Sequence, residues 1–307
     1  MRVTMRAMTK KSTLPSPAPA SDARSVSRWG QDRRLEFIDW RLRWDGRINR
    51  SDLTSFFGIS IPQASLDIAK YLEMAPSNAV YDRSARVYVA SPTLQAAFPS
   101  NTPERYLNEL LMRAASVLPE ELSFLGWTPP VDLAPSPGRA VPAEILAPLL
   151  LAAREGKQVV ASYQSMSALE PTKRALSPHA VANDGFRWHV RAYCHLRAEF
   201  RDFIIPRILS VQNTDEPGMD ASNDEAWNRK VTLVLGPNPE LSPAARKVIE
   251  LDYGMAGGQV KLECRQALLF YTLKRLGLLE GQEAPPEVQQ IALVNRDEIV
   301  GWLPKGG

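Results

Sequence analysis

Residues 184–208, DGFRWHVRAYCHLRAEFRDFIIPRI, carry the side chains of this sequence that are best suited to bind an anion. A strand places alternate side chains on opposite faces, so the start of this segment divides into an apolar face and a polar face. The apolar face holds Trp188, Val190, Ala192 and Cys194. The polar face, which we call the basic shelf, holds Arg187, His189, Arg191, Tyr193 and His195. Arg forks bind phosphate oxygens, and His or Tyr rings stack on bases.

The basic shelf needs a second strand to support it. After a break that contains Arg197, Glu199 and Arg201, residues 202–208 are rich in aromatic and branched side chains and predict a strand antiparallel to the first. Basic residues on the outer face of a half-buried hairpin are ordinarily solvated charges. The alternation alone therefore leaves a binding surface and a solvated surface as alternatives.

Catalysis has few candidate groups in this sequence. The histidines are His179, His189 and His195, and the cysteines are Cys194 and Cys264. Cys194 and His195 are adjacent on a strand and point to opposite faces, which excludes a simple thiolate–imidazole pair. Ser165, His179 and Asp184 are another combination, but no nucleophile-elbow pattern surrounds the serine. Because no HExxH, CxxC, Walker loop or spaced acidic cluster occurs either, we expect no enzyme, no metal and no cofactor.

The length of 307 residues is sufficient for two or three domains with their own cores. Through Arg50 the sequence has twelve Lys or Arg against five Asp or Glu, whereas the remainder is slightly acidic. This imbalance indicates a polyanionic partner for the N-terminal part. Two distant cysteines give no disulfide framework, and no apolar run has the length of a membrane span. We expect a soluble, cytoplasmic protein without membrane association.

Residues 1–30 are rich in Ser, Pro, Ala and Arg and lack apolar periodicity, which predicts a disordered tail. The absence of acidic residues before Asp22 is shared with transit peptides. Pro15, Pro17 and Pro19 oppose the amphipathic helix that a transit peptide needs. The later methionines also leave open a misplaced start codon.

Three helices are expected after the tail. The first runs from Arg33 to Trp44, and the second is a short helix that opens at residues 48–53. Gly58 then introduces a third helix, for which Ser60 and Gln63 predict a capping box. The stripe expected to be buried on this third helix consists of Ile61, Ala64, Ile68 and Leu72.

A short helix, a turn with Gly and a capped helix are typical of a helix-turn-helix, although three-helix domains unrelated to DNA share this periodicity. Strands at 79–82 and 86–89 predict a hairpin, which would be the wing of a winged helix-turn-helix at residues 31–92. Its third helix would expose Gln63, Ser65, Asp67 and Lys70, of which Asp67 faces an anion unfavourably and more commonly has a structural role. The candidate DNA contacts are Arg41, Arg43, Arg47, Arg50, Ser60, Gln63, Ser65, Lys70, Arg83 and Arg86.

The remaining chain divides into three segments. Residues 93–141 predict a linker with a helix at 104–118. A second domain is expected at 142–215, with a helix at 143–155 followed by about five strands. Residues 228–307 predict an α+β module of alternating strands and helices, and the fold class is therefore α+β with several domains.

The second domain resembles the WYL domain, a family named after a Trp-Tyr-Leu triplet. Here the triplet position holds Trp188-His189-Val190, and the family-like residues around it are Tyr163-Gln164-Ser165, Ser177-Pro178-His179, Arg191-Ala192-Tyr193, His195-Leu196-Arg197, Phe200-Arg201 and Pro206-Arg207-Ile208. The resemblance implies a small SH3/Sm-like β-barrel that binds an anionic effector, a nucleic acid or a nucleotide. The positions that it implies for effector binding are Tyr163, Ser165, His179, His189, Arg191, Arg201 and Arg207.

The whole layout resembles WYL-type repressors of phage-defence operons such as BREX and CBASS. This resemblance implies a homodimer, joined through the C-terminal module, that binds double-stranded DNA at an inverted-repeat operator until an effector releases it. Two alternatives remain open from the sequence. One is a WYL-type activator, and the other is an accessory protein that holds single-stranded nucleic acid without operator specificity.

Overall fold

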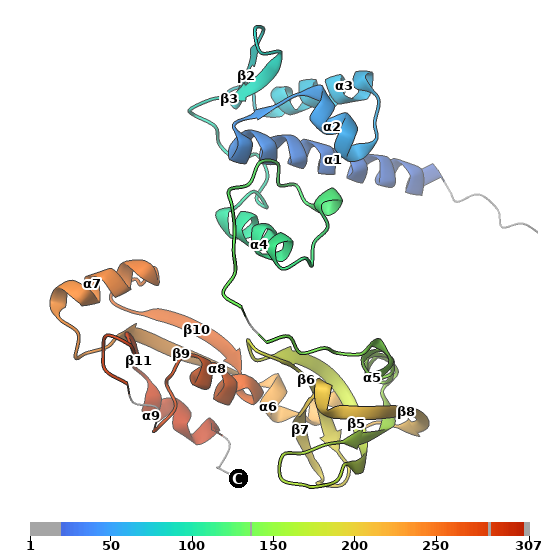
Figure 1. Cartoon of the computed structure of the whole chain (residues 1–307), viewed down its shortest axis with the longest axis vertical. Helices are drawn as coiled ribbons and strands as arrows, with labels where there is room; N and C mark the ends of the chain where they lie inside the picture. Colours follow the sequence, from blue (N-terminus) through green and yellow to red (C-terminus); the bar gives the residue numbers. More distant parts are fainter. Residues whose placement is uncertain (1–19, 136, 282–283, 304–307) are drawn as a thin grey trace, which may run out of the picture. The chain divides into compact units, whose positions relative to one another are not determined.

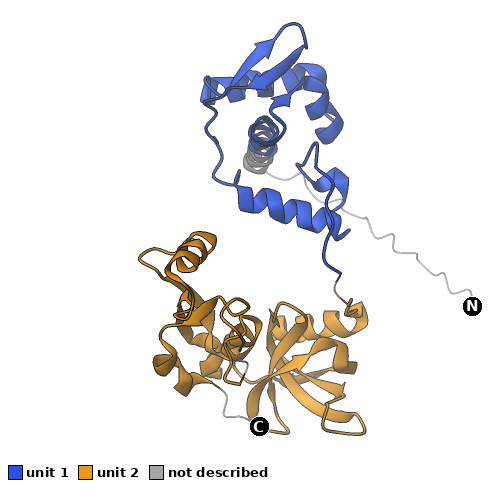
Figure 2. Ribbon diagram, turned by 60° about the vertical axis from the view of Figure 1, so that its left-hand side comes forward, with its two compact units in different colours: residues 1–136 blue, residues 137–307 orange. Residues whose placement is uncertain are grey.

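The structure, a computed structural model, describes residues 20–303 except for residues 136 and 282–283. It consists of two compact units, an N-terminal unit up to Ser136 and a C-terminal unit from Pro137 (Figure 2). Residues 1–19 of the expected tail lie outside the described residues. The rest of that tail is helical rather than disordered, because helix α1 spans Ala20–Asp45 and begins before the expected residue Arg33.

The N-terminal unit is a three-helix core with a small sheet. Its elements are α1, β1 (Arg47–Ile48), α2 (Arg50–Phe57), α3 (Ile61–Met74), β2 (Ala79–Asp82), β3 (Val87–Ala90) and α4 (Pro103–Ala114) (Figure 1). Strands β2 and β3 form the predicted hairpin, and the two-residue strand β1 pairs with β3 to give the order β1-β3-β2. Helices α2 and α3 with this hairpin form a winged helix-turn-helix.

Local signals at the helix ends explain the turn between α2 and α3. The complete capping box lies on α2, where the Asn49 side chain accepts from the backbone of Asp52 and the Asp52 carboxylate accepts from the backbone of Asn49. Ser60 caps α3 by accepting from the backbone of Gln63, but the Gln63 side chain bonds elsewhere, so the capping box predicted there is only half formed. Gly58 ends α2 in the left-handed region.

The φ of Gly58 is 65°, and a Cβ added there would meet nothing within 4 Å. We therefore expect Gly58→Ala to lower the free energy of unfolding of the N-terminal unit by about 1–2 kcal/mol through backbone strain alone. Urea denaturation of the two proteins measures this difference. A change near zero would mean that the turn relaxes out of the left-handed conformation.

Helix α3 buries a different stripe from the one expected. Ala64, Ile68 and Tyr71 are buried, whereas Ile61 is 64% exposed. The stripe is rotated because Asp67, which we expected to be exposed, is fully buried and forms an ion pair of 2.6 Å with Arg34 of α1. The prediction of an exposed Asp67 was wrong, and its structural role is confirmed.

The segment expected to be a linker contributes to the N-terminal core. Phe124 and Leu125 are buried with the residues of α1 and α2. Asp39 of α1, which is fully buried, accepts hydrogen bonds from the Tyr71 hydroxyl, the backbone of Ala97 and the Asn101 amide. Residues beyond the wing are therefore tied to α1 by a buried carboxylate.

The C-terminal unit contains two sheets. The first part comprises α5 (Ala143–Glu155), β4 (Lys157–Tyr163), β5 (Thr172–Asn183), β6 (Trp188–Cys194), β7 (Glu199–Ile204) and β8 (Ile208–Pro217). These strands pair in the order β7-β6-β5-β4-β8, and within the part of the chain described here no ladder joins β7 to β8. The sheet is thus open rather than a closed barrel. Helix α5 packs on its apolar face against β4, β5 and β8, where Ile145 and Leu149 share a core with Val159 and Leu176.

The hairpin of β6 and β7 is antiparallel as predicted, but its register is shifted. The second strand is β7, which ends at Ile204, and the residues up to Ile208 turn into β8. The break that we expected after Cys194 is a tight turn, in which Ala198 has a φ of 53°. The shift places Asp202 directly opposite Arg191.

The second part of the C-terminal unit is an α+β module. Its elements are α6 (Glu225–Asn228), β9 (Lys230–Pro237), α7 (Pro243–Asp252), β10 (Val260–Arg265), α8 (Leu269–Arg275), β11 (Ile291–Leu293) and α9 (Arg296–Ile299), and its sheet has the order β10-β9-β11. Leu233, Leu269 and Leu273 form the centre of its core. The strand β11 and the helix α9 were not predicted.

Candidate functional sites

The exposed side of α3 presents the polar side chains of Gln63 and Ser65, each of which is positioned by a hydrogen bond to a neighbouring side chain. Gln63 Nε2 donates to Asp67 Oδ1 at 3.1 Å, and Ser65 Oγ accepts from Arg50 Nε at 2.8 Å. Both side chains remain partly exposed. Because each makes only local bonds, Gln63 and Ser65 can exchange these partners for a base edge or a phosphate oxygen.

Most of the predicted DNA-contacting cations of the N-terminal unit are exposed. These are Arg43, Arg47, Lys70, Arg83 and Arg86. Arg47 lies in β1, opposite Val89 of the wing strand, and Arg86 lies at the end of the wing turn with a φ of 57°. Arg41 differs from the others because it forms an ion pair with Asp45, four residues further along α1.

The centre of the basic shelf is buried, which corrects the expectation of an open surface, whereas His195 at its end is exposed. His189 is 2% exposed and Arg191 is 7% exposed, so β6 is covered on both faces. Trp188, expected on the core face, is half exposed at the beginning of the strand. The cover consists of residues 218–228, which we call the strap, and of helix α8.

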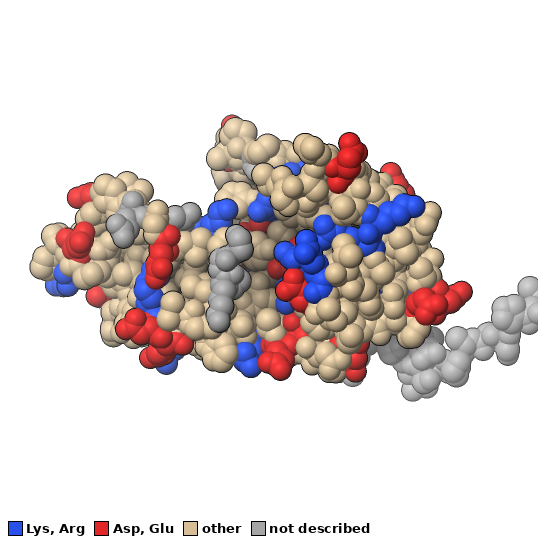
Figure 3. Space-filling model, turned by 90° about the horizontal axis from the view of Figure 1, so that it is seen from below, with Lys and Arg blue, Asp and Glu red and all other residues tan. Residues whose placement is uncertain are grey.

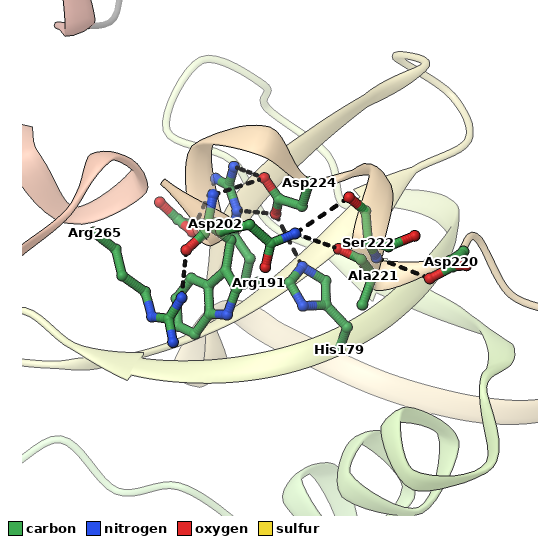
Figure 4. Close-up of polar contacts among 10 residues, drawn as sticks. His179, Arg191, Asp202, Asp220, Ala221, Ser222, Asp224 and Arg265 are labelled. Carbon is green, nitrogen blue, oxygen red and sulfur yellow. Dashed lines mark hydrogen bonds and ion pairs between the residues drawn. The ribbon is translucent and has the colours of Figure 1, made fainter. Parts of the chain in front are cut away.

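Arg191 lies at the centre of a buried ion-pair network (Figure 4). Its Nε donates to Asp224 Oδ2 at 2.8 Å and its NH2 donates to Asp224 Oδ1 at 3.0 Å, which is a two-point pairing with the carboxylate. Its NH1 donates to Asp202 Oδ1 at 3.2 Å. His179 Nε2 lies 2.9 Å from Asp224 Oδ2. The guanidinium that we expected to bind an effector is therefore occupied by two carboxylates of the same chain.

Asp224 belongs to the strap and is 1% exposed. It caps the short helix α6 by accepting from the backbone of Trp227, and the strap begins with bonds from Gly218 to Gly156 and from Met219 to Ser177. Burial raises the pKa of Asp224, but the bonds from Arg191 outweigh burial and lower it overall. Asp224 is thus a fixed negative charge against the basic shelf.

A second carboxylate, Asp184, organises the other end of β6. It accepts from His189 Nε2 and from Arg187 Nε, each at 3.0 Å, and from the backbone of Phe186. These bonds outweigh burial, which acts in the opposite direction, and lower the pKa of Asp184. The Nδ1 atom of His189 is buried and has no hydrogen-bond partner among the residues that the structure describes.

Tyr271 of α8 connects this network to the C-terminal module. Its hydroxyl donates to Asp202 Oδ2 at 3.1 Å, and its ring centroid lies 4.9 Å from that of His189. Burial, followed by the charge of Asp202, raises the pKa of the Tyr271 hydroxyl. The chain of contacts from Tyr271 through Asp202 to Arg191 therefore joins the two parts of the C-terminal unit.

Three other positions implied by the WYL resemblance lie apart from Arg191 in their contacts. Tyr163 is buried in the core and packs edge-to-face on Phe203. Ser165 Oγ lies 3.4 Å from Ser167 Oγ in an exposed turn. For Arg207, no side-chain hydrogen bond or ion pair is found within the described ranges.

Arg201 is on the opposite side of the sheet from Arg191. It pairs with Ala192 in the ladder of β6 and β7, and residues that pair directly share a face. Its guanidinium forms an exposed ion pair with Glu199. Of the seven positions, the structure joins only His179, His189 and Arg191 through shared carboxylates and Tyr271.

The combination of Ser165, His179 and Asp184 does not form a catalytic arrangement. His179 bonds to Asp224, whereas Asp184 bonds to His189. Over the described residues no group of three or more His, Cys, Asp or Glu side chains is placed to hold a metal ion. In the same residues, no helix has the length and apolar character to cross a membrane.

The acidic partners of the basic shelf were not predicted from the sequence. Asp202 had a usable signal, since a tight turn after Cys194 places it opposite Arg191. Asp224 had none, because it lies 33 positions beyond Arg191 in a stretch without periodicity. Tyr271 was likewise hidden, in a predicted helix of the next module.

Titration of these groups predicts how stability depends on pH. Burial lowers the pKa of His179 below its ordinary value of 6.5, although Asp224 opposes this effect. On acidification His179 is protonated in the unfolded chain before it is protonated in the folded chain. The free energy of unfolding therefore falls as the pH falls below about 6.5. The lowered pKa values of Asp184 and Asp224 add a second loss as the pH falls below about 3.8.

We therefore expect the free energy of unfolding of the C-terminal unit to fall in two stages on acidification. The slope of the first stage is at most about 1.4 kcal/mol per pH unit. His179→Gln keeps a donor to Asp224 and removes only the first stage, which urea titrations between pH 8 and pH 3 would show. An unchanged first stage in this variant would assign it to another group.

Three known families match this chain, and their boundaries fall between the winged helix-turn-helix and the two parts of the C-terminal unit. Residues 30–112 match the family described as "BrxR transcriptional regulator winged helix-turn-helix domain", and residues 144–213 match the WYL domain. Residues 230–299 match the "BrxR transcriptional regulator, C-terminal dimerization domain". The fold and these matches define a WYL-domain transcriptional regulator, and the resemblance noted from the sequence is confirmed.

Three relatives match over nearly their whole length, each named "DNA-binding transcriptional repressor CapW". The one from Pseudomonas aeruginosa is 52% identical over 293 residues, which cover 95% of this chain and 98% of the relative. That from Escherichia coli (strain KTE188) is 48% identical, covering 91% and 94%, and that from Stenotrophomonas maltophilia is 44% identical, covering 92% and 95%. The chain belongs to this CapW family of transcriptional repressors, which are regulators and not enzymes.

Proposed function

We propose that this protein is a homodimeric transcriptional repressor that binds an inverted-repeat operator with α3 and the wing. The observation that carries the proposal is the winged helix-turn-helix, with Gln63 and Ser65 on the accessible side of its recognition helix. The near full-length similarity to proteins named DNA-binding transcriptional repressors supports it. The match to a dimerization domain at residues 230–299 supports the dimer.

The proposal includes two kinds of contact with DNA, to base edges and to phosphates. Gln63 and Ser65 read base edges in the major groove, since an amide pairs at two points with adenine. The exposed cations Arg43, Arg47 and Lys70, with those of the wing, bind phosphates and make the affinity fall with salt. A phage-defence operon is the proposed target, from the resemblance to the BrxR and CapW regulators.

The proposed effector is a nucleic acid or a nucleotide that binds the basic shelf. Asp224 now pairs with Arg191 and hydrogen-bonds His179, so an anionic effector has to displace this carboxylate. The displaced strap runs directly into β9 of the C-terminal module. A shift of the strap would then change the spacing of the two recognition helices and release the operator.

A footprint of the purified protein on the DNA upstream of its own gene tests the repressor function. At physiological salt, and with excess nonspecific competitor, we expect protection of an inverted repeat that overlaps a promoter. Protection upstream of the promoter with increased transcription would show an activator. Retention on single-stranded DNA without any footprint would show an accessory protein instead.

A further inference from the structure

A cavity of about 340 Å³ opens next to the basic shelf, between the turn that connects β5 to β6 and the helix α8. We call it the basic pocket. The residues that line it are Arg139, Asp184, Phe186, Arg187, Tyr271, Lys274 and Arg275. All of them belong to the C-terminal unit. Its volume is within the range of small-ligand sites, about 300–1,000 Å³.

The basic pocket has an excess of positive charge that the protein does not neutralise. Four of its lining side chains are cationic and one is a carboxylate. Within the described residues, the side chains of Arg139, Lys274 and Arg275 form neither a hydrogen bond nor an ion pair. The single carboxylate, Asp184, already accepts bonds from His189 and Arg187. These cations are therefore available to bind an anion from outside the chain.

This excess is local and is not part of a uniformly basic surface. On the face shown in Figure 3, Lys and Arg side chains lie among Asp and Glu side chains. A broad positive field would attract any polyanion, whereas separate clusters of both signs favour ligands that fit one cluster. The basic pocket thus has the character of a small-ligand site.

An aromatic wall adds a second requirement for the ligand. Phe186 lines the basic pocket and is 69% exposed, so its ring is accessible to a ligand. Tyr271 lines the same cavity with its hydroxyl already bonded to Asp202. An exposed ring among cations is a stacking surface for a planar group that carries negative charge, as a nucleoside phosphate does.

The backbone fixes one of the cations. Gly185 has a φ of +95°, and a Cβ placed there would lie 3.0 Å from Cδ of Arg275 and 3.2 Å from its Nε. Arg275 therefore packs directly against the β5–β6 turn, where no larger residue fits without moving it. This packing holds its guanidinium at the basic pocket without an ion pair.

We propose that the basic pocket binds a nucleoside phosphate, with the phosphate on Arg139, Lys274 and Arg275 and the base on Phe186. The site is distinct from the one at Asp224, and binding there does not depend on the repressor function. Because Tyr271 also bonds Asp202, which pairs with Arg191, the occupied pocket is connected to the basic shelf. The ligand is either a free nucleotide or the phosphorylated end of a single strand.

Calorimetry with the full-length protein tests this site, using AMP, adenosine and a 5′-phosphorylated deoxypentanucleotide as probes. We expect the phosphorylated probes to bind and adenosine to bind much more weakly. Lys274→Ala with Arg275→Ala should weaken binding at least about tenfold. Arg197→Ala with Lys247→Ala removes two exposed charges elsewhere in the same unit and should leave binding unchanged. Tighter binding of the pentanucleotide than of AMP identifies a strand end, and equal binding identifies a free nucleotide.

Substitutions at two uncharged positions, Gly185 and Phe186, separate the basic pocket from a general effect of charge. Gly185→Ala moves Arg275 and should weaken binding of AMP, while Phe186→Ala should weaken AMP binding and Phe186→Trp should restore it. Equal losses in both double variants, or unchanged binding in the Lys274 and Arg275 variant, would overturn the proposed site. A footprint on the operator that persists without any nucleotide binding overturns this site alone, whereas nucleotide binding without a footprint overturns the repressor function alone.

Discussion

Arg191→Ala is expected to destabilise the C-terminal unit by about 3–5 kcal/mol, because it leaves two carboxylates buried without their cation. The side chains of Asp224 and Asp202 are 1% and 9% exposed, so water cannot replace the guanidinium. Arg191→Lys should recover only part of the loss, since an ammonium cannot make the two-point pairing with Asp224. Urea denaturation of the full-length protein measures the difference, and hydrogen exchange in β5–β7 assigns it to this unit.

Arg201→Ala is the matched control for that experiment. Arg201 lies on the neighbouring strand β7, but its ion pair with Glu199 is exposed. Exposed pairs contribute about 0–1 kcal/mol, so this variant should unfold almost like the unmodified protein. Similar small effects of both variants would show that the basic shelf is open to solvent and that the pairing of Arg191 with Asp224 contributes little.

The second large effect is expected at the recognition helix. Gln63→Ala together with Ser65→Ala should reduce operator affinity about 100-fold or more, since each base contact contributes about 1–3 kcal/mol to discrimination. Neither side chain belongs to the core. Asp67, the partner of Gln63, keeps its ion pair with Arg34, and Ser65 loses only its bond from Arg50. The unfolding midpoint should therefore remain near that of the unmodified protein. Gel shifts on the footprinted operator and on a scrambled duplex measure the two affinities.

Lys70→Ala provides the comparison for a phosphate contact. Lys70 is exposed on the same helix, where it pairs with Glu73. Its loss should weaken binding to the operator and to the scrambled duplex alike and lower the dependence on salt by about one unit of slope. If the double variant behaved in this way too, Gln63 and Ser65 would not read bases, and the recognition-helix assignment would fail.

The winged helix was predictable because its signals are local. Gly58 and Ser60 mark the end of α2 and the beginning of α3 within three residues. The apolar spacing of α1 indicates which side of that helix faces the core. The position of the α3 stripe was not predictable in this way. It depends on Asp67, whose partner Arg34 lies on another helix.

The exposure of the basic shelf could not be predicted from alternation. The period of two correctly placed His189 and Arg191 opposite Val190 and Ala192, but it reports only the direction of side chains and not what covers them. The cover comes from a strap whose Asp224 is 33 positions away from Arg191. The charged face of β6 is therefore buried by a contact between residues too far apart in the sequence for a local pattern to predict it.

The route of the strap after Asp224 has a mechanical consequence. Asp224 is anchored to the sheet by Arg191, and only five residues separate it from Lys230, where β9 begins. Between these points the carbonyl of Trp227 accepts from Arg265, and the carbonyl of Arg229 accepts from the backbone of Gln266. This connection is short and hydrogen-bonded along its length, so it cannot absorb a displacement of Asp224 by changing its own conformation. Movement at one end of the strap must pull on β9 or break these bonds.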